Sequence, residues 1–149
     1  MLTELLPEDI PKYWDLIKHA MERGLPPVVH ADSETRNRIF TSLLAGGMTC
    51  FVSHIVKDDQ SLVEGIVLTS ILEDNCSGTR NLLMYLVYGI TKTTSETWIE
   101  GYEYFSKYAR SRACTQFIGY TDVEKVKRIV EMFGGEARFT LITVPLDSE

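Results

Sequence analysis

Apolar residues are most concentrated in residues 81–113, where two patterns follow one another. Residues 81–90 (NLLMYLVYGI) are almost continuously apolar or aromatic, which is typical of a strand covered on both faces. After a polar linker, apolar residues recur at the spacing of one helical face, and they are Trp98, Ile99, Tyr102, Phe105, Ala109 and Ala113. Thr97 and Glu100 predict a capping box at the start of this helix. A central strand should therefore run into a long helix that packs on the sheet.

The residues before this element predict a short strand and two helices. The strand covers 2–6, and the first helix covers 7–23, with a proline in its first turn. Residues 25–30 contain two prolines and are expected to form an extended loop. A second helix should start at Asp32-Ser33-Glu34, which offer caps, and end at the glycines 46–47.

The middle of the chain predicts an antiparallel meander. Residues 48–56 and 62–72 are rich in β-branched and apolar residues, and the polar residues 57–61 separate them. A second polar turn at 73–80 leads into the central strand. Three consecutive strands are therefore expected.

The remainder of the chain predicts a strand, a helix and a final strand. Residues 115–120 form the first strand, and Asp122 should cap a helix that ends at the glycines 134–135. Residues 137–146 (ARFTLITVPL) should form the last strand. The expected order is β-α-α-β-β-β-α-β-α-β, an α+β (α/β) domain over residues 1–149 with a mixed sheet of about six strands and about four helices.

Composition and charge restrict the function further. The chain has 149 residues with 44% hydrophobic and 24% charged residues, which is an ordinary globular composition. A net charge of −6 disfavours nucleic acid as a partner, because contact with phosphates needs a surplus of Lys and Arg. No stretch approaches the ~20 apolar residues of a membrane span, and no leader pattern is present. A soluble, cytoplasmic protein is expected.

Cysteine and histidine usage argues against a metal site. The three cysteines are Cys50, Cys76 and Cys114, an odd number without a C-x-x-C pair, so neither a disulfide framework nor a zinc site is indicated. The three histidines are His19, His30 and His54, and their spacing matches no metal motif.

The element order, the strand-to-helix junction at 81–113 and the sequence IVEMFGG at 129–135 before a strand resemble the GNAT acetyltransferase superfamily. The resemblance spans nearly the whole chain and implies a GNAT-like fold. In particular, the sequence is similar to small GNAT-like proteins of tailed phages, some of them acetyltransferases and some internal virion proteins.

The resemblance implies an acetyl-CoA site beside Val87, Tyr88 and Gly89, with phosphates held at the start of the following helix. In the family, an R/Q-x-x-G-x-G/A loop wraps the pyrophosphate, because glycines let backbone N–H groups approach it. Here residues 91–97 contain neither glycine nor arginine. Lys92, Thr93, Thr94 and Ser95 offer alternative contacts, whereas Glu96 and Glu100 would repel a phosphate. The same carboxylates also suit a helix start, where they cap it and complement its dipole.

The catalytic marks of the family are also altered. Alignment on Gly134 places Val130 at the position of the family's general-acid tyrosine and Val123 at that of an asparagine, and neither can move a proton. Candidate replacements are Tyr85 and Tyr88 on the central strand and Asp122, and each also has a structural explanation, as a core tyrosine or as a helix cap.

Two hypotheses follow. In the first, a degenerate GNAT-fold protein binds a protein partner or a second copy of itself, as a virion component or an inhibitor, in the host cytoplasm or the phage particle, with no cofactor. Tyr104 and Tyr108, four residues apart and off the predicted core face, are candidate partner contacts or pack on a neighbouring loop. In the second, the chain is an active N-acetyltransferase that moves an acetyl group from acetyl-CoA to an amine, which attacks the thioester directly.

Overall fold

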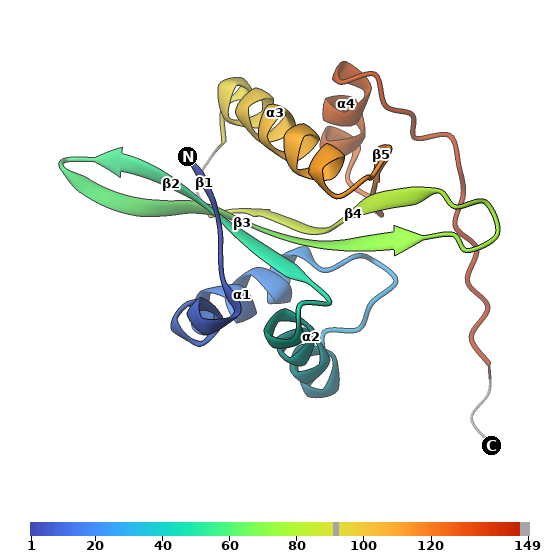
Figure 1. Ribbon diagram of the computed structural model, residues 1–149, viewed down its shortest axis with the longest axis horizontal. Helices are drawn as coiled ribbons and strands as arrows, with labels where there is room; N and C mark the ends of the chain where they lie inside the picture. The colour runs from blue at the N-terminus through green and yellow to red at the C-terminus, as the bar shows by residue number, and fades with distance from the viewer. Residues whose placement is uncertain (91–92, 147–149) are drawn as a thin grey trace.

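In the computed structural model, which describes residues 1–90 and 93–146, a mixed sheet separates two pairs of helices. The strands are β1 (Leu2–Glu4), β2 (Thr49–Lys57), β3 (Gln60–Glu73), β4 (Arg80–Gly89) and β5 (Gln116–Ile118), and they lie side by side in chain order. The helices are a 3-10 turn η1 (Pro7–Asp9), α1 (Ile10–Gly24), α2 (Ser33–Ala45), α3 (Ser95–Ser111) and α4 (Glu124–Met132). Figure 1 shows α1 and α2 on one face of the sheet and α3 and α4 on the other.

Each face of the sheet has its own hydrophobic core. On the side of α1 and α2, a cluster includes Ile10, Ile17, Ala20, Met21, Ile39, Leu43, Cys50, Val52, Ile66, Leu68 and Leu86. On the side of α3, a second cluster contains Phe51, Val67, Leu82, Phe105, Ala109 and Cys114. Residues 50, 51 and 52 thus alternate between the two cores, as the two-residue period of a strand requires.

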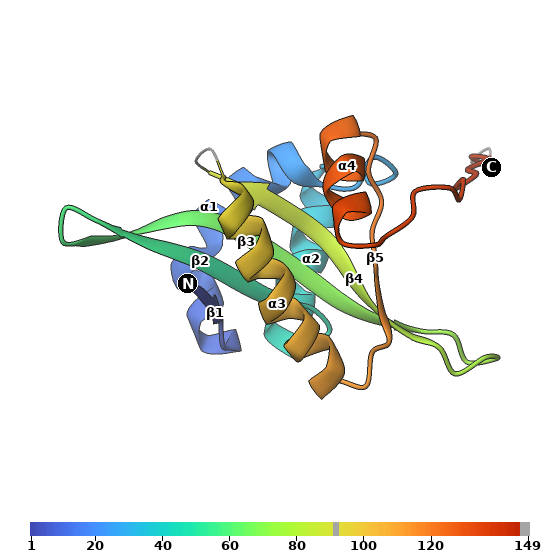
Figure 2. The ribbon, with the colours of Figure 1, turned by 90° about the horizontal axis from the view of Figure 1, so that it is seen from above.

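The strands β1 to β4 pair antiparallel, and β5 pairs parallel to β4 after the crossover through α3. The β2–β3 turn is tighter than expected, because Asp58 and Asp59 both adopt positive φ (52° and 60°) and close a two-residue hairpin. The long, twisted hairpin extends from the body in Figure 2.

Two β-bulges modify the central strands. The register shifts so that Glu64 on β3 has no paired residue on β2, and Tyr85 on β4 has none on β3. A bulge bends its strand and increases its twist. On β4 the bulge also puts both Tyr85 and Leu86 against the core of α1 and α2.

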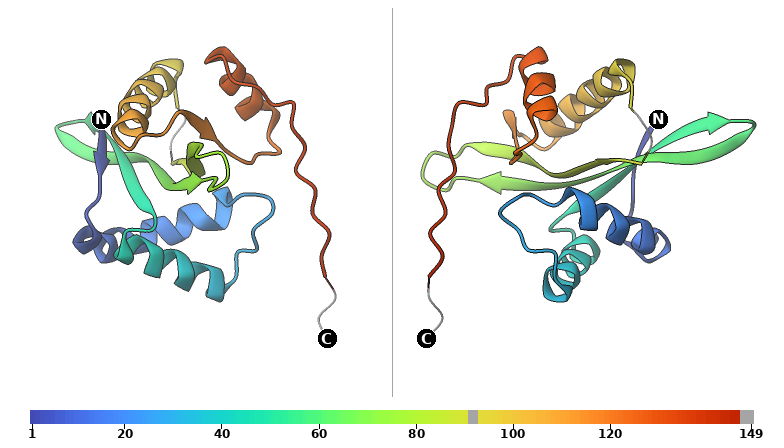
Figure 3. Two further views of the ribbon diagram at one scale, coloured as in Figure 1. Left: turned by 45° about the vertical axis from the view of Figure 1, so that its right-hand side comes forward. Right: turned by 180° about the vertical axis from the view of Figure 1, so that it is seen from behind.

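The strand expected at 137–146 is not formed, so the sheet has five strands rather than about six among the described residues. These residues are exposed and run past the edge of the sheet (Figure 3). A strand exists only where a neighbour completes its hydrogen-bond ladder, and no described residue of this chain does so here.

Candidate functional site at the end of strand β4

The candidate site lies where β4 and β5 part. The two strands pair over only three positions, from Asn81 with Gln116 to Leu83 with Ile118. Beyond Met84, β4 continues to Gly89 without a strand partner on this edge in the described part of the chain. The bulge at Tyr85 lies at the start of this divergence. The geometry leaves a free stretch of β4 backbone, the kind of edge that can pair with an extended ligand.

The next element is the start of α3, which follows the end of β4. Thr94 is the N-cap: its backbone is extended, and its hydroxyl oxygen accepts the Thr97 N–H at 3.3 Å. The Trp98 indole N–H donates to the Thr93 hydroxyl at 3.0 Å. The predicted capping box of Thr97 and Glu100 is therefore wrong, because the helix begins at Ser95 and Thr97 occupies the third position of its first turn.

Two carboxylates lie in the first two turns of α3. Glu96 is exposed in the first turn of α3, where it complements the positive end of the helix dipole. Glu100 lies one turn further on, and its carboxylate is 3.4 Å from the amino group of Met1. Lys92, a predicted phosphate contact, lies outside the described residues.

The described residues at this helix start differ from the glycine-containing loop that the family resemblance implies. Residues 93–97 contain no glycine that would let a backbone N–H approach a phosphate closely. The Thr97 N–H already donates to Thr94, and Glu96 brings a negative charge to the helix end. Repulsion between two like charges 4 Å apart is about 1 kcal/mol even in bulk water. The predicted contacts Thr94 and Ser95 thus serve as the cap and the first residue of α3.

The side chains of Tyr85 and Tyr88 on β4 point to the face of the sheet that α1 and α2 cover, opposite to α3. Tyr88 packs on the core beneath α1, and its ring lies edge-on to that of His19 with centroids 5.9 Å apart. Tyr85 is half-buried in the same core, and burial raises the pKa of its hydroxyl. Val87, on the side of α3, is 43% exposed. The structure thus brings Val87, Tyr88 and Gly89 to the candidate site through their backbone, with the tyrosine side chains turned away from α3.

Asp122 lies in the loop between β5 and α4. It is exposed, and it does not cap α4 as predicted, because Val123 holds the N-cap position without a side-chain bond. The Val123 N–H donates instead to the Thr121 hydroxyl at 3.1 Å. Val123 and Val130 stand at the family's asparagine and tyrosine positions, and both are partly exposed aliphatic residues.

Tyr104 and Tyr108 were predicted to lie off the core face of their helix. This prediction is wrong, because both side chains pack against the core between α3 and the sheet. Both rings lie edge-on to Phe51, at centroid distances of 5.9 and 4.9 Å. The Tyr108 hydroxyl reaches Thr49 at 3.5 Å, and the Arg112 guanidinium lies over the Tyr108 ring. The core face of α3 is rotated from the expected one, so Ile99 and Tyr102 are 46% and 39% exposed. Partner binding through these tyrosines stays a prediction.

Sequence reasoning did not single out Glu64, a buried carboxylate beside the candidate site. Its oxygen accepts the Ser53 hydroxyl at 2.8 Å, and its backbone carbonyl accepts the Ile90 N–H at 2.8 Å, where the chain leaves β4. The signal was the charged residue followed by Gly65 inside an apolar strand, because that combination is typical of a bulge.

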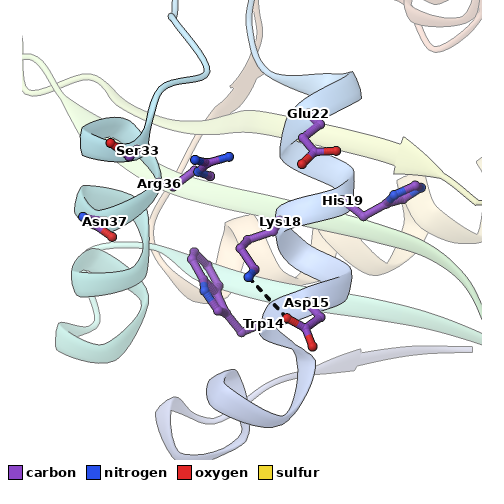
Figure 4. A pocket seen from close by; sticks show the side chains of 8 residues that line it. All are labelled: Trp14, Asp15, Lys18, His19, Glu22, Ser33, Arg36 and Asn37. Carbon is purple, nitrogen blue, oxygen red and sulfur yellow. Dashed lines mark ion pairs between the residues drawn. The ribbon is translucent and has the colours of Figure 1, made fainter.

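A separate hollow of about 510 Å³ lies between α1 and α2. Figure 4 shows Lys18 paired with Asp15 and Arg36 reaching from α2 toward α1, whereas the His19 ring points away from the hollow. The lining is completed by Trp14, Glu22, Ser33 and Asn37. Acidic and basic groups are balanced here, so the hollow has no charge preference for one ligand class.

Other kinds of site find no support in the described residues. Within residues 1–90 and 93–146, no group of three or more His, Cys, Asp or Glu side chains could hold a metal ion. Among the same residues, none of the helices has the length and apolarity needed to cross a bilayer.

Solved structures of similar fold identify the architecture. A probable acetyltransferase superposes with a TM-score of 0.71 at 14% identity over 100% of this chain and 99% of that one. The chain has the GNAT acetyltransferase fold. A ribosomal-protein-alanine N-acetyltransferase from Brucella melitensis gives a TM-score of 0.67 at 11% identity, covering 98% of this chain and 99% of that one.

A predicted acetyltransferase from Clostridium acetobutylicum, solved with acetyl-CoA, gives a TM-score of 0.70 at 11% identity over 97% of this chain and 95% of that one. No family model matches the sequence, and no curated protein matches it. The likeness is thus one of GNAT fold, in agreement with the predicted fold class.

Proposed function

We propose that this chain is a degenerate GNAT-fold protein that acts by binding another protein rather than by transferring acetyl groups. The observation that carries the proposal is the start of α3, where Thr94 takes up the Thr97 N–H and Glu96 adds a negative charge. A pyrophosphate could not use the Thr97 N–H without displacing the cap, and it would lie near the Glu96 carboxylate.

The surroundings of the three predicted proton-transfer candidates, Tyr85, Tyr88 and Asp122, support the same conclusion. A general acid or base must lie within hydrogen-bond reach of the reacting atoms. Tyr85 and Tyr88 belong to the core on the side of α1, and Asp122 is an exposed residue of the loop between β5 and α4. Binding also suits the surface, because several large apolar side chains near the C-terminal end are exposed. We propose a role as a phage virion component or inhibitor, acting in the host cytoplasm or the phage particle.

An active N-acetyltransferase is the second candidate. One observation favours it: β4 and β5 diverge beside Val87, so the free backbone edge is kept, and a similar structure was solved with acetyl-CoA. This alternative requires acetyl-CoA to bind without the contacts that glycines would provide.

Calorimetric titration with acetyl-CoA tests the proposal. The wild type is expected to show no binding tighter than a Kd of about 1 mM, and no thermal shift. The variant Glu96→Gln removes the first-turn charge, and Glu103→Gln, an exposed acid further along α3, is the matched control. Binding that appears only in Glu96→Gln would show that this carboxylate opposes the phosphates. Micromolar binding by the wild type would contradict the proposal.

A further inference from the structure

The hollow between α1 and α2 contains two groups of opposite charge that do not pair with each other. Its volume of about 510 Å³ suits a small molecule. Arg36 reaches into it from α2, and Glu22 lines it from α1 (Figure 4). Among the described residues, no ion pair holds the Arg36 guanidinium, and the Glu22 carboxylate pairs only with its exposed neighbour Arg23, at 3.9 Å. Both groups can therefore take up a ligand.

The ends of the two helices reinforce these charges. Glu22 lies in the last turn of α1, where unpaired backbone carbonyls make the helix end partly negative. Ser33 is the first residue of α2, and Arg36 follows within about one turn, where free N–H groups make the helix end partly positive. The α1 side of the hollow thus favours a cationic group, and the α2 side favours an anionic one.

The rest of the hollow adds an apolar surface without further unpaired charge. Lys18 and Asp15 form an ion pair of 3.3 Å and so neutralise each other. Trp14 is half-buried, and its ring packs on that of Phe40 with centroids 4.6 Å apart. The packed indole gives a rigid apolar surface between the two helices, on which an aliphatic group can lie.

We propose that this hollow binds a small zwitterion that carries both an ammonium and a carboxylate group, the chemistry of a free amino acid or a dipeptide. The Arg36 guanidinium donates to the carboxylate, and the Glu22 carboxylate accepts from the ammonium. A simple anion would lie near Glu22 and a simple cation near Arg36, so like-charge repulsion disfavours both. Only a ligand with both charges can use both sides of the hollow.

This inference goes beyond the proposed function. The described lining of the hollow comes entirely from α1 and α2, which cover one face of the sheet, whereas α3 lies on the other face (Figure 1). The zwitterion is bound unchanged, and its binding does not require that acetyl-CoA bind or fail to bind at the start of α3.

Tryptophan fluorescence tests the proposal. The chain has two tryptophans, Trp14 and Trp98, so the variant Trp98→Phe leaves Trp14 as the sole reporter. L-Leucine and L-leucyl-glycine are the zwitterionic probes, and N-acetylleucine and leucinamide each lack one of the two charges. At least one zwitterion is expected to bind with a Kd of about 1 mM or less. The two analogues should bind roughly tenfold more weakly, because each loses one charged hydrogen bond. The tighter of the two zwitterions shows whether the ligand is an amino acid or a dipeptide.

Substitutions on the two helices locate the contacts. Arg36→Gln and Glu22→Gln should each weaken zwitterion binding about tenfold, because each removes one charged partner. The matched control is Arg38→Gln on α2, because Arg38 pairs with Glu34 at 2.7 Å and does not line the hollow. Its affinity should stay unchanged. Thermal melting shows whether each variant is folded, and the analogue series needs no substitution in the hollow.

Two results would overturn the proposal. One is the absence of saturable binding of either zwitterion at millimolar concentrations. The other is binding of N-acetylleucine or leucinamide as tight as that of the zwitterions, which would make the hollow a site for a simple ion. Acetyl-CoA plays no part in these titrations, so this proposal and the proposed function fail separately.

Discussion

Replacing Phe51 with alanine is expected to lower the free energy of unfolding by about 3–5 kcal/mol. The side chain is fully buried in the core between the sheet and α3. Three aromatic rings of α3 lie edge-on to it, those of Tyr104, Phe105 and Tyr108, at centroid distances of 5.9, 4.9 and 4.9 Å. The loss of one ring thus removes the contact that fixes α3 on the sheet.

Urea denaturation followed by circular dichroism measures this effect. The control is Val56→Ala on the same strand, an exposed position where the change should stay within about 0.5 kcal/mol. A cost below about 1 kcal/mol for Phe51→Ala would mean that α3 does not depend on this contact.

A loss of stability at alkaline pH is the second large effect. Burial raises the pKa of the Cys50 thiol from 9.0 to about 12. The folded state therefore keeps this thiol protonated at a pH where the unfolded chain ionises it. The stabilisation is complete below pH 9 and is lost as pH rises from 9 to 12, by up to about 4 kcal/mol in total.

Denaturation curves at pH 9 and pH 10.5 measure this loss. Tyr85 and Tyr104 also have raised pKa values from burial, so a Cys50→Ala variant provides the reference slope. The wild type is expected to lose about 2 kcal/mol more than this variant over the interval. An equal loss of stability in the wild type and in Cys50→Ala would show that Cys50 ionises in the folded state as it does in the unfolded chain.

The fold was largely predictable because its periodicities are strong. The apolar run at 81–90 appears as β4, and the helix predicted between the caps at 32–34 and the glycines 46–47 appears as α2, with Asp32 as its cap. The order of elements also led to the GNAT fold. Helix starts were less accurate. The N-cap of α3 is Thr94, three residues before the predicted cap Thr97, and both residue types suit a cap.

The orientation of side chains was harder to predict. The bulge at Tyr85 reverses the alternation of β4, so residues beyond it face the opposite side from an ideal strand. On α3, Tyr104 and Tyr108 turn inward because Phe51 offers them an aromatic partner from a distant strand. Neither the bulge nor the aromatic packing on Phe51 can be recognised from the periodicity of apolar residues in the sequence.

The residues of the candidate site lie at the end of β4, where the sequence predicted them, but their role in binding a cofactor stays a prediction. The sequence located Val87, Tyr88 and Gly89 at the end of β4 and showed that the glycines of the cofactor loop are missing. It did not reveal Glu64 beside the site or the free edge left by the short pairing with β5. The strand predicted at 137–146 has the right composition but needs a partner that the described residues of its own chain do not supply.

The most direct test of the central claim is a ¹⁵N–¹H correlation spectrum of the protein titrated with acetyl-CoA. The informative amides are those of Val87 to Gly89 on β4 and of Ser95 to Thr97 at the start of α3. If α3 is closed by its own cap and by Glu96, none of these signals should move in a saturable way. Saturable shifts confined to these two stretches would contradict the account and indicate a GNAT-fold protein that still binds its family's cofactor.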